Sequence, residues 1–367
     1  MQHVTVYREP GRYAGWPANY GIWSWGDEIV VVFTRGFTSP EGGFHARDTS
    51  RPFLPVQARS LDGGLSWEIA PMPCRLPGGR GLSADEHMDR ELRAKTALER
   101  GGENMPAPCP GDVDLTHPDL ALMCARTGLG AGTVAWFYLS TDRCRAWQGP
   151  YALPSFGLPG VEARTDYIIS GPRTCALFLT ASKSGGGEGG HVFMARTRDG
   201  GATWRTVSRV TLEQAEGWAI MPSSVRLGEG RILTAVRCSG GVGVGQQMDK
   251  WIDLYASDDD GATWRYVGRP APDTGRGGNP PAMVRLPDDR LVLVYGYRNP
   301  PYSLCARVSA DAGETWGDEI TLRQGAGNHD LGYPRVALRS DGTLVIVYYW
   351  NDAAEGDRYI AATLWRP

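Results

Sequence analysis

The sequence lacks several features that would assign its class at once. It has no run of about 18 apolar residues, so no segment is long enough to cross a membrane as a helix. Its formal net charge is only -3, which argues against a surface that binds nucleic acid. The start, MQHVTVYREP, has no basic segment followed by an apolar one. We therefore expect no secretion signal and a cytoplasmic location.

Cysteine is also sparse. The 7 cysteines are scattered, odd in number and include no CxxC pair. This pattern argues against a disulfide framework and against a zinc site, and it predicts free thiols in a reducing compartment. The chain shows no motif for a nucleotide, flavin or haem. We therefore expect no metal and no organic cofactor.

Glycine and proline, in contrast, are abundant. The chain of 367 residues contains 49 glycines and 26 prolines, which predicts many turns between short strands. A hydrophobic content of 41% and a charged content of 22% are typical of a globular protein. The length suits one large all-β domain or two ordinary ones. Because one repeat runs through most of the chain, we expect a single domain over residues 1–367.

That repeat has the pattern Ser/Thr-x-Asp-x-Gly-x-x-Trp. An aspartate can accept hydrogen bonds from backbone N–H groups just downstream, glycine supplies an unusual backbone angle, and tryptophan anchors the returning strand. The pattern therefore predicts aspartates that hold turns rather than bind ligands. The five copies begin at Ser60, Ser140, Thr197, Ser257 and Ser309, and Cys144 replaces the glycine of the second.

The surrounding segments predict a closed ring of sheets. An apolar strand precedes each repeat, and a hairpin such as SVRLGEGRILTAVR lies further upstream. Four antiparallel strands per unit are typical of a propeller blade. We count six blades, the last beginning near Tyr333 without a repeat, and we expect the N-terminal HVTVYR to pair into it and close the ring.

One interval is longer than the others. Residues from about 74 to 112, after the first repeat, are extra and contain SADEHMDRELRAKTALERGG, which favours helix. We expect a partly helical insertion. It is either a solvated surface segment or a lid over one face of the ring.

The repeats resemble the Asp-box (BNR) repeats of the sialidase (neuraminidase) superfamily, and the resemblance covers nearly the whole chain. It implies a sialidase-like six-bladed all-β propeller. It also implies an exo-acting glycosidase that cleaves an acidic glycan, either sialic-acid-like or uronic-acid-bearing. Such enzymes clamp the substrate carboxylate with three arginines, and they use an aspartate as acid/base and a tyrosine nucleophile activated by a glutamate.

Four residues match these parts by position. Arg237, closing ILTAVR, looks like the second clamp arginine, and Arg298, closing LVYGYR, looks like the third. Tyr333 in GYPRVALRSDG occupies the place of the nucleophile. Asp48 in HARDTSRP lies before the first repeat, as the acid/base aspartate does.

Two parts do not match. The family's first arginine stands two residues before a proline, but here Gly15 occupies that position before Pro17, although Arg12 lies in the same loop. Met221 precedes Pro222 in place of the activating glutamate. A tyrosine without a partner base is a poor nucleophile near neutral pH, because its reference pKa is about 10.

Further polar residues stand where the first strands of the blades begin. Glu162, Arg164 and Asp166 share one face of an extended strand, where they either bind or protonate a sugar or form an ion-paired blade contact. His117 and the pair His329-Asp330 are acid/base candidates or structural hydrogen-bonding groups. The predicted catalytic residues are Tyr333, Asp48, Asp330 and Glu162, and the predicted substrate-binding residues are Arg12, Arg51, His117, Arg164, Asp166, Arg237 and Arg298.

Three functions remain open on this reading. The first is hydrolysis of an acidic glycan, with arginines binding the carboxylate and Tyr333 or a water attacking the anomeric carbon. The second is a lyase-type β-elimination from a uronate, with histidine or tyrosine as base. The third is a glycan-binding propeller without catalysis. All three imply a carbohydrate partner, and none predicts an oligomeric state.

Overall fold

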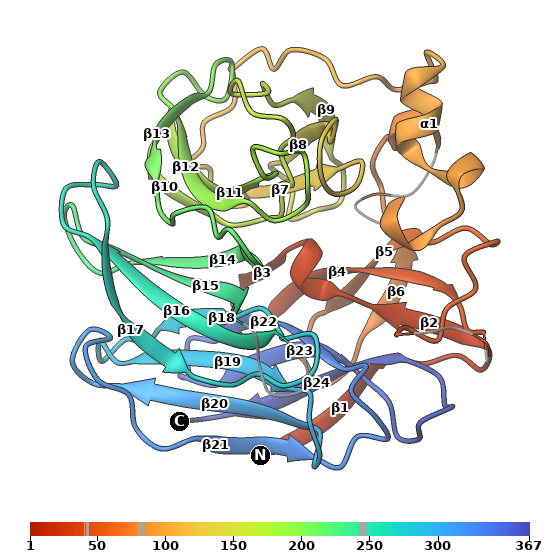
Figure 1. Ribbon diagram of the computed structural model, residues 1–367, viewed down its shortest axis with the longest axis vertical. Coiled ribbons are helices and arrows are strands. Elements are labelled where there is room, and N and C mark those ends of the chain that lie inside the picture. Colours follow the sequence, from red (N-terminus) through yellow and green to blue (C-terminus); the bar gives the residue numbers. More distant parts are fainter. Residues whose placement is uncertain (40, 42–43, 80–81, 83–84, 242–247) are drawn as a thin grey trace.

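Six antiparallel sheets are arranged around a central axis in the computed structural model (Figure 1). The structure describes residues 1–367 apart from 40, 42–43, 80–81, 83–84 and 242–247. The predicted six-bladed β-propeller is confirmed. Within the described residues, four blades have four strands, the first has five and the second has three.

The strands follow one another around the ring in chain order. The first blade holds β2 (Arg12–Gly15), β3 (Ile22–Trp25), β4 (Glu28–Phe37), β5 (Leu54–Ser60) and β6 (Glu68–Pro71), and the second holds β7 (Ala121–Arg126), β8 (Ala135–Ser140) and β9 (Gln148–Ala152). The third holds β10 (Tyr167–Gly171), β11 (Thr174–Ala181), β12 (His191–Thr197) and β13 (Arg205–Arg209), and the fourth β14 (Trp218–Arg226), β15 (Ile232–Gly240), β16 (Asp249–Ser257) and β17 (Arg265–Ala271). The fifth holds β18 (Ala282–Arg285), β19 (Leu291–Tyr297), β20 (Ser303–Ser309) and β21 (Ile320–Gln324). The sixth holds β22 (Gly332–Leu338), β23 (Leu344–Trp350), β24 (Tyr359–Trp365) and β1 (Gln2–Tyr7).

The N-terminal strand closes the ring, as the sequence predicts. β1 pairs antiparallel with β24, so the two ends of the chain lie in the same blade (Figure 1). This pairing gives the last strand of the chain a hydrogen-bonded neighbour and leaves one fewer open sheet edge.

The repeated aspartates hold turns. In the first repeat, the Asp62 carboxylate accepts hydrogen bonds from the backbone N–H groups of Leu65 and Ser66 at 3.0 and 2.9 Å. The Ser60 hydroxyl donates to Asp62 at 2.8 Å and accepts from Gly64 N–H at 2.8 Å. Gly64 has a φ of +95°, and a Cβ there would lie 2.8 Å from Val345 of the sixth blade, so a larger residue is excluded.

The apolar strand segments pack between neighbouring blades. All seven residues of β23 and of β24 are buried. Val292 and Val294 of β19 belong to the same cluster as Ile346 of β23, which joins the fifth blade to the sixth. The blades are therefore held together by continuous hydrophobic contact, and the polar residues at the axis lie in a fixed frame.

The insertion after the first blade is partly helical, as expected. It contains the 3₁₀ segments η2 (Pro77–Gly79), η3 (Asp85–His87) and η4 (Arg90–Leu92) and the helix α1 (Ala94–Glu99). Helix α1 lies at the side of the ring (Figure 1). No helix among the described residues is long and apolar enough to cross a membrane.

Candidate functional site

A cavity of about 300 Å³ lies where the blades converge. Its walls come from the first, second, third, fourth and sixth blades, from the segment that precedes β18, and from η3 of the insertion. The charged groups that line it are of both signs. They are Glu86, Glu162, Glu188, Arg164, Arg237 and Lys250.

The same unusual backbone conformation occurs in three of these blades. Trp16, Met221 and Tyr333 each precede a proline and have φ values of 59°, 53° and 51°. A left-handed conformation is uncommon for residues other than glycine, and it is often found at functional sites. All three residues lie at the cavity or beside it. Trp16 and Tyr333 line the cavity, and the Met221 sulfur lies 3.4 Å from Arg237, which also lines it.

Tyr333 is held by an arginine rather than by a carboxylate. The Arg237 guanidinium donates a hydrogen bond to the Tyr333 hydroxyl oxygen at 2.9 Å. Burial alone would raise the pKa of Tyr333, but the charges of Arg237, Arg298 and Arg164 outweigh burial and lower this pKa. The surroundings thus make the Tyr333 hydroxyl more acidic than an ordinary phenol, which brings it closer to the nucleophilic phenolate form.

Arg298 supports this region from behind the cavity. Its guanidinium donates to the backbone oxygens of Leu331 and Gly278 at 3.0 and 3.1 Å and to the Tyr349 hydroxyl. The guanidinium carbon lies 5.3 Å from the centre of the Tyr333 ring. Arg298 therefore contributes charge to Tyr333, but each of its three nitrogens already donates one hydrogen bond within the protein and the residue is not part of the cavity lining.

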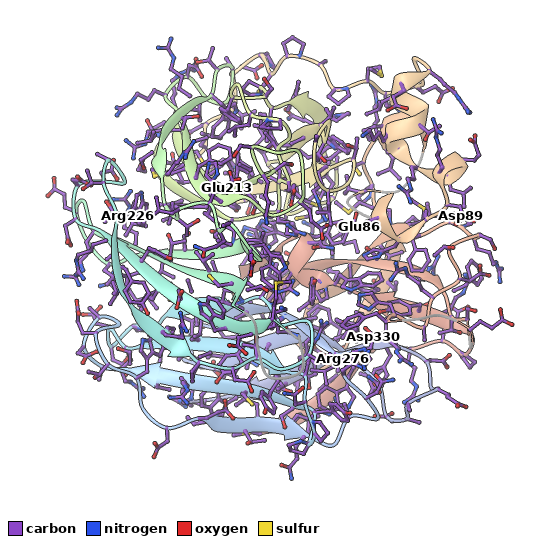
Figure 2. The ribbon with its side chains drawn as sticks, viewed as in Figure 1. Glu86, Asp89, Glu213, Arg226, Arg276 and Asp330 are labelled. Atoms are coloured by element: carbon purple, nitrogen blue, oxygen red, sulfur yellow. The ribbon has the colours of Figure 1, made fainter. Side chains whose placement is uncertain are left out.

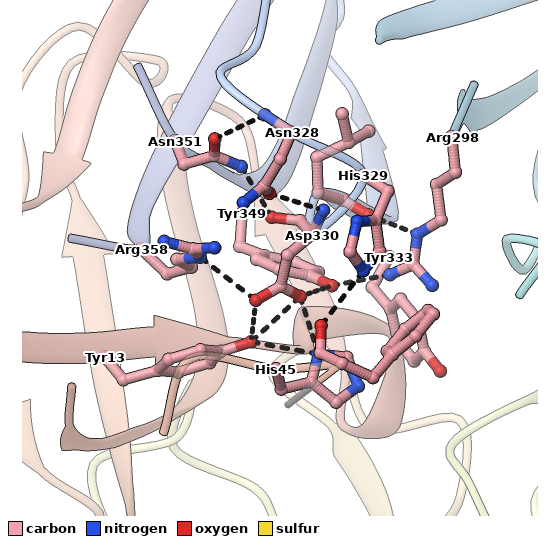
Figure 3. A network of polar contacts seen from close by, with 12 residues as sticks. Tyr13, His45, Arg298, Asn328, His329, Asp330, Tyr333, Tyr349, Asn351 and Arg358 are labelled. Atoms are coloured by element: carbon pink, nitrogen blue, oxygen red, sulfur yellow. Dashed lines mark hydrogen bonds and ion pairs between the residues drawn. The ribbon is translucent and has the colours of Figure 1, made fainter. Parts of the chain in front are cut away.

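Asp330 lies at the centre of a buried network (Figure 3). Its carboxylate accepts hydrogen bonds from the hydroxyls of Tyr13 at 3.0 Å and Tyr349 at 2.9 Å, and from Arg358 Nε at 3.0 Å. Burial would raise the pKa of Asp330, but the neighbouring His45, Arg358 and Arg298 hold it well below its usual range. Asp330 is a fixed anion with no exposed surface, so it suits positioning better than proton transfer to a ligand.

The sequence analysis missed His45, which links this network to the cavity. His45 Nδ1 lies 2.6 Å from Asp330 Oδ1, and the ring lines the cavity. Burial lowers the pKa of His45 more than Asp330 raises it. The residue lies only three positions before Asp48, but no motif distinguishes a histidine in this loop from the other five in the chain.

Two glutamates of the third blade reach the cavity in different states. Glu162 is buried, and its Oε1 accepts from Gly130 N–H and Gly189 N–H, both at 3.0 Å. Glu188 reaches solvent at the cavity. Desolvation by the protein around it and the charge of Glu162 raise the pKa of Glu188. Glu188, which the sequence analysis also missed, is thus the carboxyl best suited to carry a proton.

The insertion contributes one wall of the cavity. Glu86 accepts a hydrogen bond from Arg126 at 2.6 Å, and the His87 ring stacks on Trp16 with 3.7 Å between ring centres. Figure 2 shows Glu86 nearer the middle of the molecule than Asp89, three residues further on. The η3 segment is therefore part of the cavity wall, so this part of the insertion is not a solvated surface segment, and the role of the insertion as a lid stays a prediction.

Several buried polar atoms around the cavity have no hydrogen-bond partner among the described residues. Arg164 donates from Nε to Asn19 at 2.9 Å, but its Nη1 has no acceptor. Burial lowers the pKa of Arg164 to about 9, so the side chain is charged at neutral pH. Buried polar groups are rarely left unpaired, which points to a polar ligand. The unpaired atoms are Trp16 Nε1, Glu86 Oε2, His87 Nδ1, Arg164 Nη1 and Arg237 Nε.

Of the predicted site residues, the structure brings Tyr333, Glu162, Arg164 and Arg237 to the cavity. Asp48 lines a separate cavity beside it. Asp166 lies in another cavity, bonded to Ser224, and burial raises its pKa to about 6.

The other predicted binding residues lie outside the cavity. Arg12 and Arg51 both stack on the ring of Phe37, at 3.9 and 3.1 Å from its centre. His117 is exposed and accepts a hydrogen bond from the backbone of Asp119. The three-arginine clamp implied by the family resemblance is therefore not assembled from Arg12, Arg237 and Arg298.

Solved structures with the same fold cover the whole chain at low identity. An unknown-function protein from Dyadobacter fermentans is 21% identical, with a TM-score of 0.71 over 99% of this chain and 97% of the other. An α-L-arabinofuranosidase from Fusarium graminearum is 13% identical, with a TM-score of 0.63 over 100% and 98% of the two chains. A Trypanosoma rangeli sialidase in complex with sialic acid is 12% identical, with a TM-score of 0.56 over 94% and 53%.

The chain matches no curated protein sequence. Residues 120–346, more than half of the chain, match the BNR repeat-like domain. The chain therefore belongs to the BNR repeat-like domain family.

Proposed function

We propose that this protein is a glycoside hydrolase that removes a terminal sugar bearing a carboxylate. The observation that carries the proposal is the set of unpaired buried donors and acceptors around one cavity, which also contains Glu188 and Tyr333. Hydroxyl groups of a sugar both donate and accept hydrogen bonds, so they suit a wall that offers both kinds of atom.

The stacked pair of Trp16 and His87 forms a rigid part of the cavity wall. The two rings are nearly parallel, with 10° between their planes, and both side chains line the cavity. The Trp16 ring also stacks on Tyr13, with 4.7 Å between ring centres, and both Trp16 and His87 are buried. The pair therefore supports the proposal by fixing the shape of the wall rather than by offering a free ring face to the sugar.

Arg164 is the best placed group for the substrate carboxylate. Arg164 is buried, its Nη1 is unpaired, and the residue lines the cavity. A charge-assisted hydrogen bond from a buried guanidinium is stronger than one between neutral groups, so an acidic sugar gains more here than a neutral one. Arg237 adds positive charge, although its Nη donors are already engaged by Tyr333 and by the Gly277 and Gly278 carbonyls.

Glu188 and Tyr333 supply the chemistry of the first step. Glu188 gives its proton to the leaving oxygen, while the Tyr333 oxygen bonds to the anomeric carbon as the glycosidic bond breaks. The raised pKa of Glu188 and the lowered pKa of Tyr333 favour these two protonation states. Water then releases the sugar and restores the phenolate.

The comparisons agree with a glycan-directed role without selecting the sugar. The neighbouring structures include proteins named as an α-L-arabinofuranosidase, an α-L-arabinanase and a sialidase. They share the ring of blades with this chain at identities between 12 and 14%. The choice of an acidic sugar rests on Arg164 and Arg237 of this chain.

Elimination from a uronate is the second candidate. A tyrosine with a lowered pKa beside arginines can remove a proton next to a carboxylate that those arginines neutralise. In this route Tyr333 acts as a base and does not attack the anomeric carbon. It produces an unsaturated sugar, whereas hydrolysis does not.

A glycoside panel separates these outcomes. Aryl β-glucuronide and aryl sialoside represent acidic sugars, aryl α-L-arabinofuranoside represents a neutral one, and a polyuronate reports elimination through new ultraviolet absorbance. The proposal predicts aryl alcohol release from an acidic glycoside. Ultraviolet absorbance from the polyuronate alone would support elimination, and glycan binding with no product would identify a binding propeller.

A further inference from the structure

We propose that His45 is the proton acceptor of the cavity: its Nε2 takes a proton from the water that releases the sugar from Tyr333, while Asp330 positions the ring. This inference rests on the proposed function and adds the residue that acts in the second step. It assigns the two proton transfers to two different side chains, Glu188 and His45.

The first support is the orientation of the imidazole. His45 Nδ1 is 2.6 Å from Asp330 Oδ1, and the Tyr13 hydroxyl lies 3.3 Å from the same nitrogen. An ionised carboxylate only accepts hydrogen bonds, so Nδ1 carries the proton and Nε2 presents a lone pair. Within the described part of the chain, Nε2 has no hydrogen-bond partner, and the side chain, 15% exposed, lines the cavity.

The second support is the rigidity of Asp330. Besides His45, its carboxylate is bonded to Tyr13, Tyr349 and Arg358, and its backbone N–H donates to Asn328 at 2.9 Å. These partners come from the first and sixth blades, at opposite ends of the chain (Figure 3). Such a network fixes both the tautomer and the direction of the imidazole, as a base requires.

The third support is the charge state of His45. The groups facing it are Asp330, Arg298, Arg47, His87 and Tyr13. Burial and the two arginines lower the pKa of His45, and Asp330 offsets this only in part. The imidazole is neutral near pH 7, which is the state that accepts a proton.

Solvent has a route to the ring. His45 also lines the second cavity, of about 470 Å³, together with Ser39, Asp48 and Ser50. The imidazole therefore lies between the sugar cavity and a polar, open depression. Water that fills this depression therefore lies against the same imidazole that lines the sugar cavity.

The atoms balance over the two steps. In the first step Glu188 loses a proton to the leaving alcohol, and the sugar becomes bonded to Tyr333. In the second step the water oxygen bonds to the anomeric carbon, the bond to Tyr333 breaks to restore the phenolate, and one water proton passes to His45 Nε2. The proton returns from His45 to Glu188 through solvent, and no oxidant or other reactant is needed.

His45→Asn is the sharpest variant, because its amide nitrogen can keep the donor to Asp330 while the cavity nitrogen is lost. With an aryl glycoside that the wild-type enzyme hydrolyses, we expect a burst of about one equivalent of aryl alcohol. Steady-state turnover should then be about a hundredfold slower, as expected for loss of a general base. Intact mass should show a sugar on the protein, and added imidazole or azide should restore turnover.

His45→Gln is the companion variant, since its amide reaches toward the position of Nε2, and both variants are compared by thermal unfolding. Turnover of His45→Asn that equals wild type, or falls without a burst or adduct, would overturn the role of His45. Failure of the wild-type enzyme on every glycoside would instead overturn the proposed function, and the inference with it. The His45→Asn variant therefore tests the role of His45, whereas the wild-type enzyme tests the proposed function.

The tautomer can be measured without any substrate. Nitrogen-15 NMR of the wild-type protein near pH 7, assigned by the His45→Gln spectrum, should show a neutral ring with the proton on Nδ1. Asp330→Asn should change that signal if the carboxylate positions the ring. A ring protonated on both nitrogens, or on Nε2 alone, contradicts the inference.

Discussion

Arg237 Nη1 donates a hydrogen bond of 2.9 Å to the Tyr333 hydroxyl oxygen, where the family resemblance implies a carboxylate. Among the described residues, no carboxylate is hydrogen-bonded to this hydroxyl. A carboxylate would accept the phenolic proton, whereas a guanidinium stabilises the phenolate by charge. Tyr333 can thus be activated by its arginines without the glutamate that Met221 replaces.

Arg237→Gln should raise the pKa of Tyr333. The substitution removes the largest of the charges that oppose the effect of burial. The measurement is the ultraviolet absorbance of tyrosinate against pH, with the Tyr333→Phe spectrum subtracted. Turnover near pH 7 should fall roughly a hundredfold, which is typical for the loss of one buried hydrogen-bond donor to a catalytic anion, here the Tyr333 phenolate. An unchanged titration would show that Arg237 does not tune the phenol.

Glu188→Gln should selectively slow substrates with poor leaving groups. A natural glycoside needs a proton on its leaving oxygen and should lose about a hundredfold or more, whereas an aryl glycoside with an acidic leaving group should lose much less. Glu355→Gln, at an exposed position in the sixth blade, is the matched control. Equal losses on both substrates would exclude Glu188 as the acid.

The same glutamate sets the alkaline limit of activity. Its pKa is raised above the ordinary value of 4.5, and the acid must be protonated to act. Wild-type turnover of a poor-leaving-group substrate should therefore fall as the pH rises through this pKa. In Glu188→Gln the residual rate should no longer fall over this pH range. Comparing the pH–rate profiles of the two proteins tests this.

Arg164→Met should separate acidic from neutral sugars. If Arg164 binds the substrate carboxylate, KM for an acidic glycoside should rise at least about tenfold, a loss of about 1.4 kcal/mol. Binding of a neutral glycoside should change little, and Arg205→Met on the outer strand β13 should change neither. Equal effects on both sugars would show that Arg164 does not bind a carboxylate of the substrate.

The repeat aspartates should contribute stability that depends on pH. Hydrogen bonds from Thr315 lower the pKa of Asp311 to about 2, below an ordinary value near 3.9. A group with a lowered folded pKa stabilises the fold above its unfolded pKa, and this contribution is lost as the pH falls toward the folded value. Asp311→Ala should thus lower the urea midpoint near pH 5 more than near pH 2.5.

Asp318→Ala is the control for that experiment, because Asp318 is exposed in the same loop and lies outside the repeat. It should leave the midpoint nearly unchanged at both pH values. A destabilisation by Asp311→Ala that is the same at both pH values would show that the carboxylate charge does not contribute.

The ring of blades was predictable because its signals are local and repeated. Each Asp-containing turn is complete within eight residues, as the bonds between Asp62, Ser60 and Ser66 show. The pairing of HVTVYR with the last blade also follows, since an open ring would leave that strand without a partner. The second blade departs from the expected four strands and has three among the described residues, because only ALMCAR and AWFYLS separate the insertion from the second repeat.

The site was only partly predictable because its residues are brought together by the ring and not by spacing. Tyr333 near the start of β22, Arg237 in β15, and Arg164 and Glu162 just before β10 are at positions that the expected hairpin pattern marks. His45 and Glu188 lie in loops, where nothing in the sequence tells which way a side chain points. Arg298 occupies a predicted position, but its donors are consumed by carbonyls that no motif records.

The most direct test of the account is the identity of the residue that becomes bonded to the sugar. A fluorinated glycoside with an activated leaving group slows release more than attack, so the intermediate accumulates and can be mapped by peptide mass spectrometry. The account predicts one sugar per protein, attached to Tyr333, and no adduct in Tyr333→Phe. A sugar attached to Glu86, Glu162 or Glu188, or normal turnover by Tyr333→Phe, would contradict it.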